Sequence, residues 1–270
     1  MPTVNEIYEY LCTIAPVGMK MDFDNVGFLV GRAGADAGKI LISLDITSDV
    51  VTEALELGAG LIVSHHPLFF SLKSVTDKDA AGGKIVRMLS GGVSAICMHT
   101  NLDAARGGTN DALAAAAGIA SGGRKAELLA EDGRLPTGEA YSYGRVGYLE
   151  NPLALSDYLG ILKAALKTGG LRYHDAGREV YKVAVVGGSG GGELHHALRH
   201  GCDTFVTSDI KYDVFLEAKE EGINLIDGDH FCTENLVAAP LAAGLRAAFP
   251  GIKAEITKKH GQTAMFYCNN

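Results

Sequence analysis

The sequence predicts an α/β protein built from two related lobes with mixed, mainly parallel sheets and a metal site between them. Three observations support this prediction. Short apolar segments alternate with amphipathic helical segments along most of the chain. Glycine accounts for 35 of the 270 residues, which suits the many tight turns between strands and helices. One helix-to-strand segment also occurs twice.

The first half of the chain shows a regular alternation of elements. Thr3 and Glu6 form a capping-box pattern, so a first helix is expected to start there and to end near Pro16. A polar loop at 22–31 then enters a short strand. The elements expected next are strands at 39–44, 61–64 and 93–98, and helices at 50–57, 83–89 and 110–117.

Residues 119–145 change in character and are rich in Gly, Glu and Arg, which predicts a crossing between domains. The expected lobes are residues 1–125 plus 229–270, carrying most candidate ligands, and residues 126–228. Beyond the crossing we expect strands at 145–149, 172–174, 180–186, 204–207 and 224–227, and helices at 153–166, 193–200, 214–221 and 233–248. Pro240 and Gly244 are expected to bend the last helix.

The repeated segment is the best argument for two related lobes. Residues 54–64 resemble residues 197–207 without a gap, at a separation of 143 residues (197 − 54). In both copies a helix runs through glycine into a buried strand that ends in polar residues. Open α/β sheets place their sites at such strand ends. Coincidence is the alternative, because this is a common type of helix-to-strand connection.

Composition argues against several classes of protein. The net charge is −8, and Lys258-Lys259 is the main cluster of basic residues, which does not favour a nucleic-acid partner. No apolar run approaches the roughly 18 residues of a membrane span, and no signal peptide is visible. The five cysteines are scattered without CxxC spacing. They are therefore expected to be free thiols, and the protein cytoplasmic.

His65 and His66 follow the strand expected at 61–64, and Pro67 then ends it. Two adjacent side chains cannot face the same side of a strand, so both rings can meet one site only if the chain already turns there. Such a turn is a common way to present imidazoles to a metal. A surface loop that carries two histidines is the alternative.

His230, Glu234 and Asp103 extend this set of donors. His230 and Glu234 are four residues apart, so a helix places them on one face, and Asp103 follows a strand end. With His65 and His66 they supply three imidazoles and two carboxylates. That set suits two ions about 3.5–4 Å apart, and Zn, Fe, Mn, Co or Ni would fit. A surface pair on a helix and a helix cap are the alternatives.

Several motifs resemble the NIF-three-like family, whose members are also named GTP cyclohydrolase 1 type 2 homologs. They are His65-His66-Pro67-Leu68-Phe69-Phe70, His99-Thr100-Asn101-Leu102-Asp103, Ser208-Asp209-Ile210-Lys211-Tyr212 and His230-Phe231-Cys232-Thr233-Glu234. The resemblance implies a dinuclear metal centre whose ligands are His65, His66, Asp103, His230 and Glu234. It also implies a ring-shaped homohexamer.

The chain departs from the family pattern at three positions. The family often has Trp, His and Gly where this chain has Phe23, Asp213 and Asp229. None of these departures removes an implied ligand.

The resulting hypothesis is a metal-dependent hydrolase that acts on a nucleotide or another phosphate-containing substrate through a water bridging two divalent ions. His99 would relay a proton or orient a ligand, and Lys211 would meet a substrate anion unless it is merely solvated. Residues 187–192 would cradle a phosphate or form the turn that starts a helix. The alternatives are a non-enzymatic metalloprotein for metal storage, delivery or assembly, and purely structural histidines.

Overall fold

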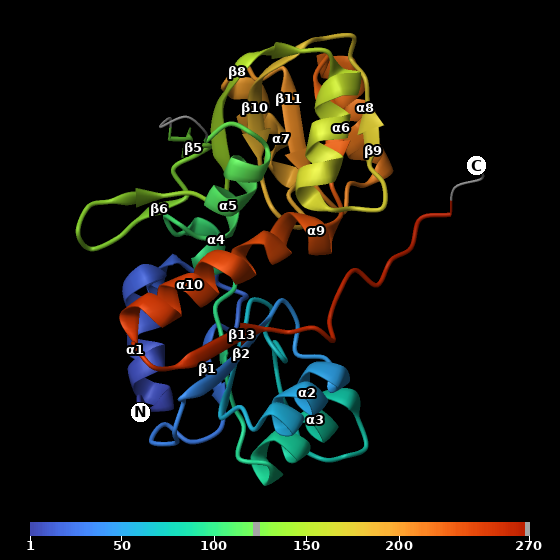
Figure 1. Cartoon of the computed structure of the whole chain (residues 1–270). Helices are drawn as coiled ribbons and strands as arrows, with labels where there is room; N and C mark the ends of the chain where they lie inside the picture. Colours follow the sequence, from blue (N-terminus) through green and yellow to red (C-terminus); the bar gives the residue numbers. More distant parts are fainter. Residues whose placement is uncertain (121–124, 268–270) are drawn as a thin grey trace. The chain divides into compact units, whose positions relative to one another are not determined.

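The computed structural model describes residues 1–120 and 125–267 (Figure 1). These residues form two compact units, described separately below. Unit 1 comprises Met1–Gly108 and Val237–Gly261. Unit 2 comprises Thr109–Leu236 and the C-terminal segment from Gln262. The lobe boundaries expected from the sequence stay a prediction about domains. They differ from these units in giving residues 109–125, residues 229–236 and the C-terminal segment from Gln262 to the first lobe.

Unit 1 is built on a five-stranded sheet in the order β1-β4-β3-β2-β13. β2, β3, β4 and β13 run parallel, and β1 is antiparallel to β4. The strands are β1 (Gly27–Val30), β2 (Lys39–Ser43), β3 (Leu61–Ser64), β4 (Ser94–Cys97) and β13 (Lys253–Ile256). The helices are α1 (Val4–Ile14), η1 (Val17–Met19), α2 (Ser48–Leu57), α3 (Ala80–Ser90), α4 (Thr100–Ala104) and α10 (Ala238–Ala248).

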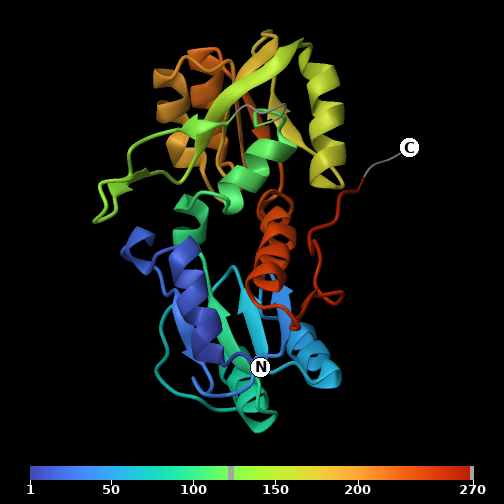
Figure 2. The ribbon, with the colours of Figure 1, turned by 60° about the vertical axis from the view of Figure 1, so that its left-hand side comes forward.

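Helices cover both faces of this sheet. On one face, Leu41, Ile62 and Ala95 pack with residues of α2 and α3 into one apolar cluster. Alternate strand residues point the other way, toward α1 and α10, which lie on the opposite face in Figure 2. The expected capping box starts α1, because Thr3 accepts a hydrogen bond from the N–H of Glu6 and donates its own to the Glu6 carboxylate.

Unit 2 is built on a six-stranded sheet in the order β5-β8-β10-β11-β12-β9. β10, β11 and β12 are parallel, and the outer strands are antiparallel to their neighbours. The strands are β5 (Glu127–Leu128), β8 (Arg145–Leu153), β9 (Arg172–His174), β10 (Val180–Val185), β11 (Thr204–Thr207) and β12 (Asn224–Asp227), and a separate hairpin pairs β6 (Gly133–Arg134) with β7 (Ala140–Tyr141). The helices are α5 (Thr109–Ala116), α6 (Leu155–Leu166), η2 (Gly191–Glu193), α7 (Leu194–Arg199), α8 (Tyr212–Glu221), α9 (His230–Glu234) and η3 (Asn235–Val237).

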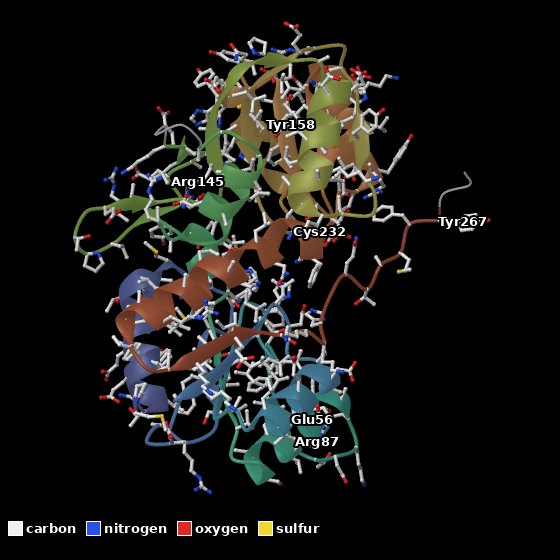
Figure 3. The ribbon with its side chains drawn as sticks, in the orientation of Figure 1. Glu56, Arg87, Arg145, Tyr158, Cys232 and Tyr267 are labelled. Atoms are coloured by element: carbon white, nitrogen blue, oxygen red, sulfur yellow. The ribbon has the colours of Figure 1, made fainter. Side chains whose placement is uncertain are left out.

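Two apolar clusters hold unit 2 together, one on each face of its sheet. Val206 and Ile226 pack with α5 and α6, whereas Phe205 and Leu225 pack with α7 and α8. Figure 2 shows α6 on one side of the sheet and α7 and α8 on the other. Tyr158 and Arg145, labelled in Figure 3, are both completely buried. The α/β fold class with mainly parallel central strands is confirmed.

The repeated segment is a structural repeat. β2 pairs with β3 in the register Ile40↔Leu61, and β10 pairs with β11 in the register Val183↔Thr204. Both residues of the second pair lie 143 positions after their counterparts in the first. Gly58 and Gly201 both end the preceding helix in the left-handed conformation. The repeat continues into the next elements, because α4 and α9 have the same length and follow β4 and β12 directly. The antiparallel strands β1 and β9 also occupy corresponding positions in the two sheets.

The helix expected at 233–248 is interrupted. α9 ends at Glu234, the short η3 follows, and α10 starts at Ala238. Pro240 lies in the first turn of α10. Backbone N–H groups in the first turn have no partner within the helix, so proline costs no intrahelical hydrogen bond there. The break therefore precedes the proline, and the two units divide there. Among the described residues, no helix has the length and apolar character needed to cross a lipid bilayer.

Candidate metal centre

Unit 1 gathers three histidines at the carboxyl ends of two neighbouring strands. His65 and His66 follow β3, and His99 follows β4. β3 and β4 are parallel and pair Ser64 with Cys97, so both strands finish at the same level. The His65–His66 pair can converge on one site because the chain leaves the strand immediately after Ser64.

The three imidazoles lie close enough to share a metal ion. Their ring centroids are 5.1 Å apart for His65 and His66, 5.2 Å for His65 and His99, and 5.4 Å for His66 and His99. One ring nitrogen from each lies within 4.8 Å of the other two. Asp103, on α4, adds a carboxylate, whose Oδ1 is 3.4 Å from Nε2 of His65.

Each of these imidazoles is held through Nδ1. The Nδ1 of His65 donates to the carbonyl oxygen of Met98 at 2.9 Å. The Nδ1 of His66 lies 2.8 Å from Asp45 Oδ1, and that of His99 lies 2.8 Å from Asp24 Oδ1. A proton on Nδ1 leaves the lone pair on Nε2, the arrangement that proteins use to present histidine to a metal.

The two carboxylates that hold His66 and His99 are strong acceptors. Burial raises the pKa of Asp24, but hydrogen bonds from His99 and Thr100 outweigh it and hold that pKa well below its usual range. Burial likewise raises the pKa of Asp45, and hydrogen bonds from His260 and His66 bring it well below normal. Both groups are therefore ionised at neutral pH, so the imidazoles donate to them.

Unit 2 presents a fourth histidine in the same way. His230 begins α9, and its Nδ1 lies 2.7 Å from Asp209 Oδ2. Its Nε2 lies 3.0 Å from Oε2 of Glu234, one helical turn further on. Burial lowers the pKa of His230, but the hydrogen bonds and charges of Glu234 and Asp209 outweigh it and raise the pKa to about 9.

Two aspartates of unit 2 take unusual backbone conformations beside this histidine. Asp209 has φ 51° and Asp229 has φ 72°. Positive φ values favour glycine, so Asp229 carries a backbone cost that the glycine of the family pattern would avoid. The Asp229 side chain accepts a hydrogen bond from the N–H of Cys232 at 3.1 Å, so it caps α9.

The glycine-rich segment 187–192 is the turn that starts a helix. The N–H groups of Gly187, Gly188 and Gly190 donate to Asn110 Oδ1, Thr233 Oγ1 and Thr207 Oγ1, respectively. Protein side chains therefore occupy three of the donors that a phosphate cradle would use. Gly188 has a second role that the sequence did not indicate. A Cβ at this position would lie 2.1 Å from Oε1 of Glu234, so only glycine leaves that carboxylate in place.

The sequence-predicted residues thus fall into two groups of donors, one in each unit. His65, His66 and Asp103 belong to unit 1, and His230 and Glu234 to unit 2. His99, expected as a proton relay or as a partner of a ligand, is presented like His65 and His66 and is itself a candidate ligand. Lys211 is exposed at the start of α8, and its role stays a prediction.

The acceptors that orient the histidines were not predicted from the sequence. Asp45 and Asp209 follow β2 and β11, so their places at strand ends were the available signal. His260 donates to Asp45 from Nε2 at 2.8 Å, and it lies after β13 where no periodic pattern marks it. All of these donors and acceptors are nitrogen or oxygen, a set that suits divalent transition metals.

Comparison with known proteins identifies the family. The sequence model of the family Duf34/NIF3 (NGG1p interacting factor 3) matches residues 2–263. The chain belongs to the Duf34/NIF3 family. The matched span includes every candidate ligand, so the family assignment covers both groups of donors.

Relatives of known name and structure agree with this assignment. A GTP cyclohydrolase 1 type 2 homolog of Clostridium perfringens is 35% identical over 233 residues, which cover 86% of each chain. Its namesake in Clostridium acetobutylicum is 35% identical over 230 residues, covering 83% of this chain and 84% of the relative. The chain is also similar in structure to a hypothetical protein of Staphylococcus aureus, with a TM-score of 0.90 at 25% identity, covering 98% of this chain and 99% of that chain.

Proposed function

We propose that this NIF3-family protein binds two divalent metal ions per chain through His65, His66, Asp103, His230 and Glu234, and is a metal-dependent hydrolase of a nucleotide or another phosphoester. One observation carries the proposal. All four histidines, including His99, direct Nδ1 to a carbonyl or carboxylate oxygen, which makes Nε2 the ring nitrogen that would ligate a metal. Packing alone does not require the same orientation four times.

Two divalent ions would lower the pKa of a shared water toward neutrality and stabilise negative charge on the attacked phosphate or carbon. The residues of this chain prepare for that role. Asp45 and Asp209 keep the Nδ1 proton of His66 and of His230 in place. Gly188 leaves room for Glu234. These contacts reduce the movement needed before the donors can ligate.

His99 and Lys211 are the candidates for work on the substrate. His99 is fixed by Asp24 and lies beside His65 and His66, so it is placed either to ligate or to move a proton. Lys211 is exposed, so its ammonium group is available to an anionic substrate. His99→Gln would distinguish the two roles. If the variant loses metal, His99 is a ligand. If it keeps its full metal content but loses turnover, His99 transfers a proton.

Metal analysis of untagged protein tests the proposal. Wild type is expected to bind two ions per chain, and His65→Ala and His230→Ala fewer. His195→Ala is the matched control, because His195 is exposed and its Nδ1 donates to the carbonyl oxygen of the nearby Gly192. Full metal content in His65→Ala would overturn the ligand assignment.

A screen of metal-loaded protein against nucleotides and phosphoesters tests the hydrolase assignment. Turnover is expected in wild type and not in Asp103→Ala. Reversible metal exchange without turnover would instead assign the protein to metal storage or delivery.

Assembly and location belong to the same proposal. Resemblance to the family supports a ring-shaped homohexamer, which light scattering of the purified protein would measure directly. The free thiols at Cys12, Cys97, Cys202 and Cys232 support a reducing, cytoplasmic compartment.

A further inference from the structure

Two phenylalanines of unit 1 are exposed beside the histidine cluster. Phe23 is 65% exposed and Phe70 is 57% exposed, although both are large apolar side chains. Their ring centroids lie 6.2 Å apart with an angle of 46° between the ring planes. The rings are therefore neighbours that do not stack on each other, and their flat faces stay available to a third ring.

This aromatic pair is continuous with the candidate metal centre of unit 1. The Phe70 ring lies 6.2 Å from the His99 ring, in an edge-to-face arrangement. Phe23 directly precedes Asp24, the carboxylate that orients His99. A group resting on the two phenylalanines would therefore lie next to the imidazoles.

Hydrogen bonds hold the two loops that carry the pair. The side-chain amide of Asn25 donates to the carbonyl oxygen of Phe69 at 2.7 Å, which ties one loop to the other. The first loop is also closed by the N–H of Asp24, which donates to Met21 at 3.0 Å, and by Lys20, which donates to the Asp24 carbonyl at 3.0 Å. Rings placed in advance bind a ligand at lower entropic cost than mobile ones.

We propose that Phe23 and Phe70 bind the base of a nucleotide substrate and so select nucleotides over phosphoesters without a ring. The inference rests on the proposed function, whose substrate class it narrows. Aromatic side chains bind any base through its π-face, whereas a ring-free phosphoester gains little from them. A second copy of the chain is the competing occupant, but a stable interface buries about 800 Å² per partner, more than two side chains supply.

Binding measurements with two probes test this assignment. GTP and inorganic tripolyphosphate carry the same phosphate chain, and only GTP carries a base. Titration calorimetry on metal-loaded protein is expected to show that Phe23→Ala and Phe70→Ala each weaken GTP binding about 5- to 100-fold and leave tripolyphosphate binding unchanged. Phe23→Trp and Phe70→Tyr are expected to retain GTP affinity, because each keeps an aromatic face. Leu89→Ala, which shortens an exposed apolar side chain on α3, is the control.

Three outcomes would overturn the proposal. The first is GTP affinity that is unchanged in both alanine variants. The second is that wild-type protein binds GTP no more tightly than tripolyphosphate, or binds neither of them. The third is an alanine variant that falls apart into smaller assemblies in sedimentation while its GTP affinity is kept, which would assign the pair to a contact between copies. Metal content is measured on the same samples, so loss of the base site is distinguished from failure of the metal centre.

Discussion

The Nδ1 of His66 lies 2.8 Å from Oδ1 of Asp45. The second oxygen of the same carboxylate accepts a hydrogen bond from His260 Nε2, also at 2.8 Å. Asp45 thus orients a candidate ligand and is itself held by a histidine that follows β13. The candidate metal centre of unit 1 therefore depends on a residue nearly two hundred positions beyond His66 in the sequence.

Asp45→Asn is expected to lower metal affinity about 10- to 100-fold, because an amide cannot accept from both histidines. Competition with a chromophoric chelator would measure the loss. Asp49→Asn is the control, since Asp49 is an exposed aspartate in the first turn of α2. Wild-type affinity in Asp45→Asn would show that this carboxylate does not orient the ligand.

Gly188→Ala is expected to reduce metal content, because the added Cβ would lie 2.1 Å from Oε1 of Glu234 and push that carboxylate aside. Gly177→Ala is the matched control. Gly177 also has a positive φ, of 72°, but nothing lies within 4 Å of its added Cβ. Both variants carry the backbone cost of about 1–2 kcal/mol, so only Gly188→Ala should lose metal in elemental analysis. Equal metal content in the two variants would contradict the packing argument.

Asp111→Ala is expected to destabilise unit 2 by about 3–5 kcal/mol, because it leaves the buried Arg145 guanidinium without its carboxylate. Arg145 is completely buried, and its guanidinium also donates to the carbonyl oxygens of Ser142 and Gly144, which are uncharged. Urea unfolding would measure the change in free energy.

Glu131→Ala is the control for that experiment. It removes the partner of Arg134 from an ion pair in which both side chains are more than half exposed. Such a pair contributes only about 0–1 kcal/mol. Similar destabilisation by the two variants would show that burial of Arg145 does not determine the cost.

The thiols of Cys202 and Cys232 are expected to resist iodoacetamide at pH 8 in the folded protein. Burial raises the pKa of both to about 12, so little of the reactive thiolate is present. Peptide mapping after alkylation, with and without denaturant, would measure the protection. Rapid modification of either thiol in the folded state would contradict the burial of these side chains.

The same pKa shifts predict lower stability at alkaline pH. Between about pH 9 and pH 12 the unfolded thiols ionise while the folded ones stay protonated. The unfolded state then binds fewer protons, so the free energy of unfolding falls as pH rises through this range. Urea titrations at pH 8 and at pH 10 would measure the decrease. A midpoint that does not fall by pH 10 would contradict the sign of the shifts.

The sequence was sufficient for most local structure, because local signals set it. The capping box of Thr3 and Glu6 starts α1, and glycine ends α2 at position 58. The separation of 143 residues between the repeated segments also predicted two related lobes, and β2–β3 and β10–β11 pair in corresponding registers. One marked difference is the break between α9 and α10, where the periodic apolar pattern continues although the backbone does not. Another is β13, which none of the expected elements covered.

The candidate ligands could be named from the sequence, because His, Asp and Glu at strand ends and at helical spacing are visible there. The tertiary structure decided which groups orient them. Asp45 meets His66 only because β2 pairs with β3, and His260 meets Asp45 only because β13 pairs with β2. Asp209 meets His230 only because β11 lies beside β12. A hydrogen bond between residues far apart in the chain depends on strand order and register. No local pattern encodes that, so Asp45, Asp209 and Gly188 acquired their roles only in the folded protein.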